Sequence, residues 1–293
     1  RVNQWCQRHG EALPVTLLEQ ASCCGKPSAL NRAMVEVSSP LVVFADARQT
    51  FEPDTVARLV ENFADPSVGA CSGELCFRSS QGGDITNAAG LYWRIEKLIR
   101  RCQAMTGSVM GVTGAVYALR TALFRPLPEH ILVDDLATPL NVMAANRRVV
   151  FDDRAIAWDE PPSEGAAETR RKIRTLAGVW QCLPVAWSAL WPARAGLLLR
   201  FFSHKLLRLL VPWLLLLLLL GSSLSASPFW QGLAVLQWAG YLLVLIAWKW
   251  PAVRALPLVS TGYFFVLLNA AAAVSLVRIL QGRSDALWKK PKG

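Results

Sequence analysis

Two adjacent carboxylates, Asp134 and Asp135, are the residues with the clearest potential for acid–base chemistry. A carboxylate within hydrogen-bond reach of a hydroxyl can remove its proton. Because neighbouring carboxylates repel each other, one of the pair is expected to have a raised pKa. The same pair could instead cap the helix predicted after Leu136, since Asp is favoured at helix starts. The residues alone leave both interpretations open.

A third carboxylate, Asp46, ends the unbroken apolar run 41–45. Ligands of open α/β sheets sit at the carboxyl ends of strands, so a carboxylate there can meet a metal-bound phosphate or a sugar hydroxyl. The alternative is a turn or cap residue ahead of residues 50–53.

Positive charges occur at two places where they could hold phosphate. Lys26 follows Gly25 and opens a predicted helix, where backbone N–H groups and a cation suit an anion. Beyond Asp135, a basic cluster occupies residues 170–174, and clustered arginines can hold a diphosphate. Lys26 could equally be an exposed lysine on a solvated face.

Three glycines, Gly107, Gly111 and Gly114, lie beside a predicted strand. Glycine lets the backbone approach a ligand closely, although a tight turn would use the same residues.

The alternation of apolar and polar residues predicts the elements that must position these groups. We expect helices at 26–37, 53–63, 88–104 and 171–190, strands at 14–19, 41–45, 68–77 and 147–151, and a glycine-broken loop and strand at 107–118. The unbroken apolar run 41–45 is typical of a buried parallel strand. The order of elements predicts an α/β fold with helices on the faces of a sheet.

The C-terminal third predicts a membrane anchor. A leucine block at 214–220 lies in the first of three apolar segments, at 209–224, 229–248 and 258–280, each near the ~20 residues that cross a bilayer. Tryptophans and leucines ahead of them suggest an interfacial helix. We therefore expect a catalytic region at 1–178, an interfacial segment at 179–205, membrane helices at 206–282 and a basic tail at 283–293.

The charge is divided unevenly along the chain. Residues 1–200 carry 22 Lys+Arg and 20 Asp+Glu, a net of +2, whereas residues 201–293 carry 9 Lys+Arg and one Asp, a net of +8. A basic excess in the membrane-like part indicates head-group contact and argues against a nucleic-acid partner. Positive residues flanking the first two apolar segments predict that the catalytic region faces the cytoplasm, and leave the side of the tail open.

Other classes of site find little support. The seven cysteines and three histidines lack zinc-ligand spacing. The apolar segments hold almost no ionisable residue, which disfavours a transporter.

Read in chain order, the motifs resemble membrane-bound family 2 glycosyltransferases, which share the GT-A fold with cellulose, hyaluronan and poly-N-acetylglucosamine synthases. The resemblance runs from about residue 14 to the apolar segments. Its motifs are the Gly-Lys-x-x-Ala-Leu-Asn of 25–31, the Val-Phe-Ala-Asp-Ala-Arg of 43–48, the segments 65–73 and 111–120, the Asp pair, and Arg171-x-x-Arg174.

The resemblance implies a role for each matching residue. Asp46 matches the first aspartate of a D-x-D motif, which faces the nucleotide-sugar diphosphate and its Mg²⁺ or Mn²⁺, and Asp135 matches the catalytic base. The resemblance also implies that Gly114, Ala115 and Asp134 bind the acceptor. On the donor side it implies, besides Asp46, the residues Lys26, Asn31, Arg48, Arg171 and Arg174.

Three departures from the family pattern matter. Arg48 stands where the second D-x-D carboxylate is expected, which puts metal dependence in doubt. The Q-x-x-R-W motif reads Arg171 to Thr175, without its Gln and Trp, which puts processive synthesis in doubt. The family's opening strands precede Arg1, so we expect a GT-A domain incomplete at its N-terminus.

The resemblance thus implies an inverting transferase that moves a sugar from a nucleotide-sugar to a lipid or glycan acceptor. Its expected place is a bacterial inner membrane, multi-pass, with the catalytic domain in the cytoplasm. Two alternatives are a processive polysaccharide synthase and a degenerate, non-catalytic membrane-anchored homologue.

Overall fold

The computed structural model describes residues 15–20, 25–77, 85–160, 166–192 and 194–282. The predicted tail 283–293 and the first fourteen residues of the predicted catalytic region lie outside the described residues.

A five-stranded mixed sheet forms the centre of the catalytic region. Its order is β1 (Leu41–Ala45), β4 (Val116–Arg120), β3 (Val68–Phe77), β5 (Arg148–Asp159) and β2 (Thr50–Phe51). Strands β3 and β5 run parallel, and the other neighbouring pairs are antiparallel.

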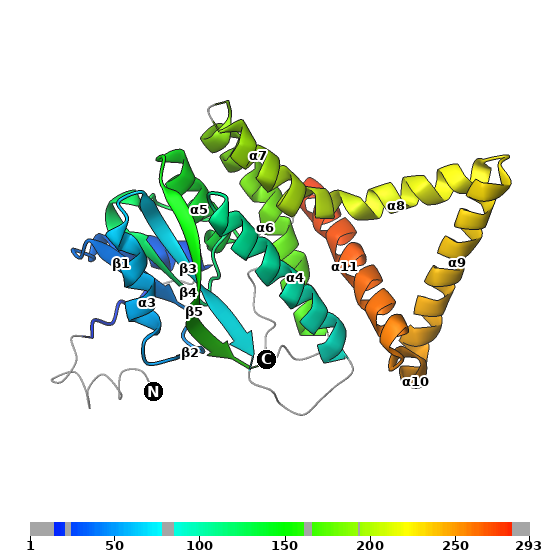
Figure 1. The fold of residues 1–293 in the computed structure, drawn as a ribbon, viewed down its shortest axis with the longest axis horizontal. Coiled ribbons are helices and arrows are strands. Elements are labelled where there is room, and N and C mark those ends of the chain that lie inside the picture. The colour runs from blue at the N-terminus through cyan, green and yellow to red at the C-terminus, as the bar shows by residue number, and fades with distance from the viewer. Residues whose placement is uncertain (1–14, 21–24, 78–84, 161–165, 193, 283–293) are drawn as a thin grey trace.

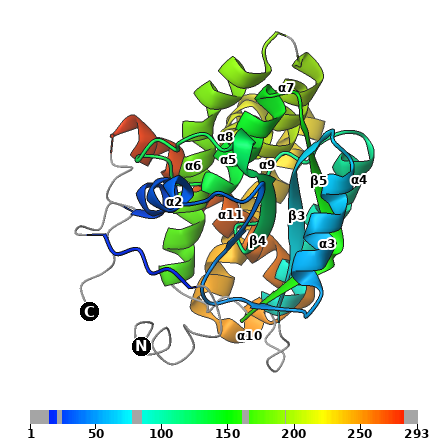
Figure 2. The same cartoon turned by 90° about the vertical axis from the view of Figure 1, so that its left-hand side faces the viewer.

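Helices cover both faces of this sheet (Figure 2). On one face, α3 (Thr55–Glu61) and the short 3-10 turn η1 (Asn62–Ala64) bury Leu59 and Phe63 against Val116 and Ala118 of β4. The alternate β4 residues, Tyr117 and Leu119, belong to the core on the other face, which also takes residues of α5 (Asp134–Ala144) and α6 (Ala166–Leu190). Burial on both faces explains the continuous apolar strands and confirms the predicted α/β class.

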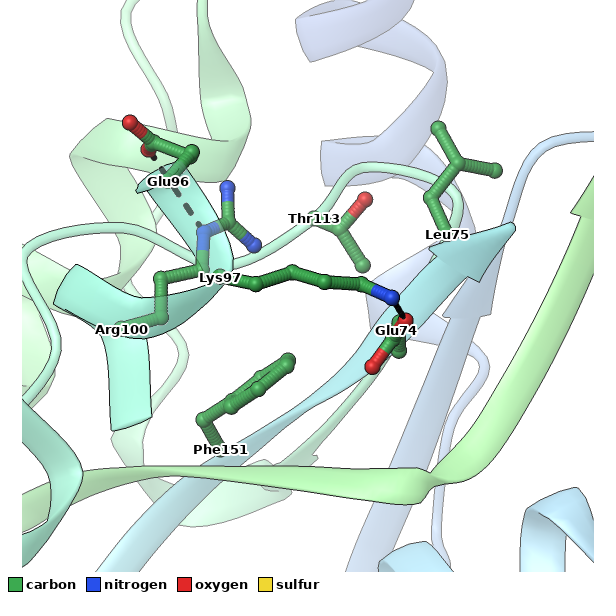
Figure 3. A pocket seen from close by; sticks show the side chains of 7 residues that line it. All are labelled: Glu74, Leu75, Glu96, Lys97, Arg100, Thr113 and Phe151. Carbon is green, nitrogen blue, oxygen red and sulfur yellow. Dashed lines mark ion pairs between the residues drawn. The ribbon is translucent and has the colours of Figure 1, made fainter. Parts of the chain in front are cut away.

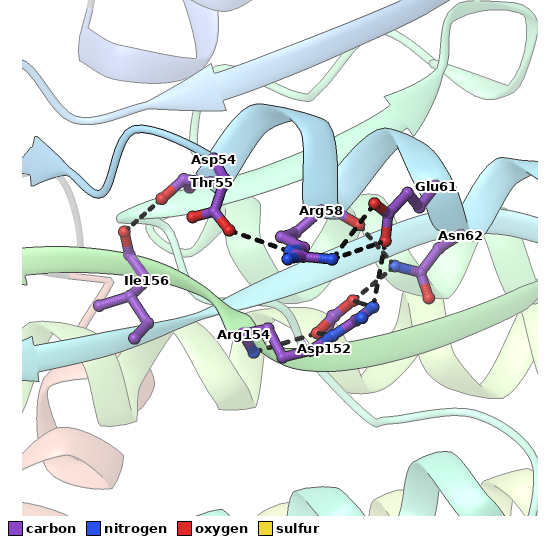
Figure 4. A network of polar contacts seen from close by, with 8 residues as sticks. All are labelled: Asp54, Thr55, Arg58, Glu61, Asn62, Asp152, Arg154 and Ile156. Carbon is purple, nitrogen blue, oxygen red and sulfur yellow. Dashed lines mark hydrogen bonds and ion pairs between the residues drawn. The ribbon is translucent and has the colours of Figure 1, made fainter.

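A polar network fastens α3 to β5 (Figure 4). Arg154 of β5 contacts Asp152 at 2.8 Å and Glu61 of α3 at 3.4 Å. Asn62 donates to the same Asp152 carboxylate at 2.9 Å, and the Thr55 hydroxyl donates to the Ile156 carbonyl at 2.7 Å. These contacts fix the sheet edge opposite β1.

The other helical elements lie before, between and after the strands along the chain. They are α2 (Gly25–Val35), α4 (Ile85–Met105), the 3-10 turn η2 (Thr121–Leu123), α7 (Ala195–Phe201), the π-turn η3 (Phe202–Leu206), α8 (Leu207–Leu224), α9 (Pro228–Lys249), α10 (Pro251–Arg254) and α11 (Pro257–Leu280). In Figure 1 the sheet lies at one end, α8, α9 and α11 lie at the other, and α4 and α6 lie between them.

Three helices are long and apolar enough to cross a membrane: Ala195–Leu224, Pro228–Lys249 and Pro257–Leu280. The prediction of three such segments is confirmed, although the first helix begins before residue 209 and includes α7 and η3. Helix α11 packs along α6, and the Lys172 ammonium lies 4.6 Å from the Phe264 ring centre across that contact.

Most predicted elements are confirmed, and three strand predictions need correction. Residues 15–20 form no strand, and Val15 and Leu17 are exposed rather than packed. The 41–45 strand pairs antiparallel with β4, not parallel. The 147–151 strand continues to Asp159, because charged residues at 152–154 bulge out of the register with β3 and hide the continuation from an apolar pattern.

Candidate active site

The Asp pair forms the first turn of α5. Val133 is the N-cap residue, and the structure gives it no side-chain capping bond, so the prediction that the pair caps the helix is wrong. Asp134 is buried, whereas Asp135 keeps partial exposure. Carboxylates in a first helical turn are favoured by the helix dipole, which helps to offset the cost of placing two of them together.

Lys26 lies between this pair and Asp46, the residue predicted to face the metal and the diphosphate. Its Nζ atom lies 3.0 Å from Asp134 Oδ2 and 3.3 Å from Asp46 Oδ1. Gly25, at a φ of 86° that favours glycine, starts α2 directly before Lys26. Burial alone would lower the pKa of Lys26, but Asp134 and Asp46 outweigh it and raise that pKa. Lys26 is therefore a firmly charged cation between two carboxylates.

The glycine loop leaves space beside the Asp135 carboxylate. A Cβ atom on Gly114 would lie 3.5 Å from Asp135 Oδ2 and 3.7 Å from Lys26 Nζ. The Val112 N–H donates to the Asp135 carbonyl at 2.9 Å, and the Asp46 N–H donates to the Ala115 carbonyl at 3.4 Å. The loop is thus bonded to both carboxylate-bearing segments. The Ala115 side chain is core, so only its backbone can face a ligand.

The surroundings of Asp135 suit a proton acceptor. Burial is the largest effect and the Asp134 charge adds to it, so that the pKa of Asp135 rises to about 6, against the opposing charges of Lys26, Lys205 and Arg100. A base works best when its pKa lies near the working pH.

Two predicted donor-binding residues make other contacts. The Asn31 amide donates to the Leu127 carbonyl at 2.8 Å and accepts from the Leu127 N–H at 2.8 Å, which ties α2 to the chain leading into α5. Arg48 Nε pairs with Asp159 Oδ2 at 3.1 Å, at the end of β5. Their donor-binding roles stay predictions.

Helix α6, which carries Arg171 and Arg174, contacts the chain at the start of α5. A Cβ atom on Gly178 would lie 2.5 Å from Val133 Cγ2, so α6 touches the residue directly before Asp134. The Leu132 N–H donates to Gln181 Oε1 at 3.1 Å. Residues three and four apart share a helix face, so Arg174 and Arg171 lie one and two turns before Gly178 on that face.

The described carboxylates fit a metal only in part. Among the described residues there is no group of three or more His, Cys, Asp or Glu that could hold an ion. Asp46 is a single, partly exposed carboxylate with Lys26 beside it. Magnesium commonly binds through one or two carboxylates together with substrate phosphates. Asp46 therefore fits an ion that is shared with a donor diphosphate, and does not form part of a preformed metal cage.

Sequence reasoning missed a buried polar cluster behind the loop. It contains Glu96 of α4 together with His204 and Lys205 of η3. Glu96 also lines a small pocket, with Glu74, Lys97, Arg100 and Thr113 among its walls (Figure 3). From the sequence alone, Lys205 is expected only to be one of the positive residues that flank the first apolar segment. A lysine so close to an apolar segment, followed by Arg208, gave no sign of burial.

Comparisons with known proteins identify the family of the chain. The family model described as glycosyl transferase family group 2 matches residues 41–273. An N-acetylglucosaminyltransferase of Sinorhizobium fredii is 29% identical over 163 residues, covering 51% of this chain and 39% of the relative. A poly-beta-1,6-N-acetyl-D-glucosamine synthase of Staphylococcus epidermidis is 21% identical over 187 residues, covering 61% and 45%. The chain thus spans less than half the length of these curated relatives.

The fold has a solved counterpart. A mannosyltransferase from Pyrobaculum calidifontis, solved with GDP-Man and Mn²⁺, superposes with a TM-score of 0.66 at 20% identity, covering 96% of this chain and 74% of that one. Together with the family match over residues 41–273, this shows that the chain belongs to glycosyl transferase family group 2 and has its GT-A fold.

Proposed function

We propose that the chain carries the catalytic site of an inverting glycosyltransferase in which Asp135 is the general base. The observation that carries this proposal is the position of the Asp135 carboxylate, whose pKa is raised and which is bordered by the side-chain-free Gly114 and by Lys26. An acceptor hydroxyl placed in that space gives its proton to Asp135. Its oxygen attacks the anomeric carbon, the bond from that carbon to the diphosphate breaks, and the nucleoside diphosphate leaves with the electron pair.

The leaving diphosphate is assigned to the positive side of the site. Lys26 can turn from Asp134 and Asp46 to the phosphates, and Arg171 and Arg174 lie on the α6 face that meets the start of α5. A divalent ion bound by Asp46 and the phosphates would neutralise charge on the leaving group. Cations fixed before the reaction stabilise charge as it develops, without rearranging during the step.

The donor class follows from the relatives, and the location from the charges. The two curated relatives handle N-acetylglucosamine and the structural neighbour carries GDP-Man, so we assign a nucleotide-activated hexose or N-acetylhexosamine as donor. Along the chain, Lys205 and Arg208 precede the leucine-rich part of the first apolar helix, and Lys249 and Arg254 lie at and after the end of the second. These positive charges support a site at a cytoplasmic membrane face, with a lipid or glycan acceptor.

A processive polysaccharide synthase is the second candidate, because the Staphylococcus relative makes a polymer. Thr175 stands where the resembling synthases carry a Trp that holds the growing chain. The proposal is therefore transfer of one or a few sugars. A ladder of long products on a gel would favour the synthase.

The test is a donor panel given to the full-length protein in membranes. UDP-N-acetylglucosamine, UDP-glucose and GDP-mannose are supplied with Mn²⁺, and release of nucleoside diphosphate is measured. We expect turnover of one donor, and its loss when a chelator removes the metal. Absence of turnover with every donor, in protein shown to be folded, would contradict the proposal.

A further inference from the structure

Two buried residues of η3 meet a buried carboxylate of α4. Lys205 Nζ lies 3.4 Å from Glu96 Oε1, and His204 Nε2 lies 3.2 Å from Glu96 Oε2. Glu96 and Lys205 are each only 7% exposed. Burying such charges is costly unless each is paired, so the pair ties the helix that leads into α8 to α4 in one specific arrangement.

The π-turn makes this double contact possible. In a π-turn the hydrogen bonds span five residues, so consecutive side chains diverge less around the axis than in an α-helix. His204 and Lys205 are consecutive residues, and both reach one carboxylate. Such turns inside helices occur frequently at functional sites.

The cluster also holds the loop that borders Asp135. Gln103 Nε2 lies 3.0 Å from His204 Nδ1, and Gln103 Oε1 accepts from the Met110 N–H at 3.2 Å. A Cβ atom on Gly111 would lie 3.9 Å from Lys205 Cε and 3.7 Å from the Asp135 carbonyl. The Lys205 side chain therefore lies beside Gly111.

The next residue of the loop bonds directly to the base. The Val112 N–H donates to the Asp135 carbonyl at 2.9 Å. A displacement of Gly111 is thus transmitted through one hydrogen bond to the first turn of α5.

We propose that Lys205, held by Glu96, is a positioning residue that sets the 110–114 loop and, through it, the Asp135 carboxylate. Docking of the first apolar helix onto α4 is then a condition for transfer, because the same lysine pairs with Glu96 of α4 and lies beside the loop. This inference rests on the assignment of Asp135 as the base.

The test compares Lys205→Met with Lys205→Arg in the full-length protein, using the donor that the panel identifies. Misplacing a reacting group by about 1 Å can cost ~100-fold in rate. We expect Lys205→Met to lower kcat by about 10- to 100-fold with donor KM nearly unchanged, because Lys205 is assigned no contact with the donor. Lys205→Arg, which keeps the cation, is expected to restore most of kcat. Lys249→Met, another lysine at the end of an apolar helix, is the control and is expected to keep wild-type kcat.

Two further measurements separate positioning from folding. Hydrogen exchange of the 108–115 segment needs no substrate, and Lys205→Met should speed exchange at Val112 specifically. If Lys205→Met does not fold, Glu96→Gln, which keeps the size of the side chain, is expected to show the same split between kcat and KM.

The outcomes distinguish this inference from the proposed function. Wild-type kcat in folded Lys205→Met, with Asp135→Asn inactive, overturns the positioning role alone. Unchanged exchange at Val112 also overturns it. Activity in Asp135→Asn overturns the assignment of the base instead.

Discussion

Asp135 owes its reactivity to neighbours from separate parts of the chain. Asp134 and burial raise its pKa, whereas Lys26, Lys205 and Arg100, from three other elements, restrain that rise. The balance leaves a carboxylate with a pKa of about 6 that borders Gly114, a residue without a side chain. A smaller shift would make a weaker base, and a shift far above neutral pH would leave the carboxylate protonated.

The first prediction concerns the pH dependence of turnover. Asp135 accepts a proton only when it is ionised, and its pKa of about 6 places loss of the ionised form below that pH. We expect kcat/KM to be level above about pH 7 and to fall roughly tenfold per unit well below pH 6. A profile that stays level down to pH 4.5, with the protein folded, would contradict the assignment.

The residues at the centre of the site could be predicted from the sequence, but the contacts that hold the surrounding elements in place could not. Four residues that the sequence predicts for the site lie together in the structure: Asp46, Lys26, Asp135 and Gly114. They could be predicted because a strand end, a glycine or an apolar turn in the local sequence marks each position. The contacts of Asn31 and Arg48 were not predictable, since their partners lie 96 and 111 positions away along the chain. The Glu96–Lys205 pair was missed for the same reason.

At the scale of elements, α6 packs closely against the start of α5 at Gly178. Any side chain at position 178 would meet the two Val133 methyl groups, at 2.5 and 2.9 Å from a Cβ atom. Since Val133 is the N-cap residue of α5, a push there moves the turn that carries Asp134 and Asp135.

We therefore expect Gly178→Ala to lower both stability and turnover. Overpacking of this kind costs about 1–3 kcal/mol, and thermal unfolding and donor turnover measure the two effects. Gly196→Ala in α7 is the matched control, because a Cβ atom there meets nothing within 4 Å. Equal melting temperatures for the two variants would show that α6 does not set the start of α5.

The strands show where sequence patterns suffice. Strands β1 and β3 have the predicted bounds. The unbroken apolar run of β1 is a continuous signal, and the first seven residues of β3 are buried. Their directions and the length of β5 depend on pairing and on a bulge at charged residues, which no local pattern encodes.

At the scale of the molecule, the apolar helices are continuous with the catalytic region. Helix α11 packs along α6 and also contacts α4. Helix α8 begins directly after η3, the turn that carries Lys205. Large apolar side chains such as Leu217, Leu236 and Leu258 are exposed on these helices, as lipid contact requires.

This arrangement predicts integral behaviour in membranes. Three helices of this length and apolarity should keep the protein in the pellet after alkaline carbonate extraction, and only detergent should release it. A peripheral membrane protein of the same host is the control. Release by carbonate would show that the apolar helices do not span the bilayer.

The most direct test of the central assignment is Asp135→Asn, with Asp134→Asn measured beside it in the full-length protein. Asparagine keeps the size of the side chain but cannot accept the acceptor's proton. Removal of a general base typically lowers turnover ~10²- to 10⁴-fold, and we expect a loss in this range with donor binding retained. Turnover near the wild-type rate in folded Asp135→Asn would contradict the account.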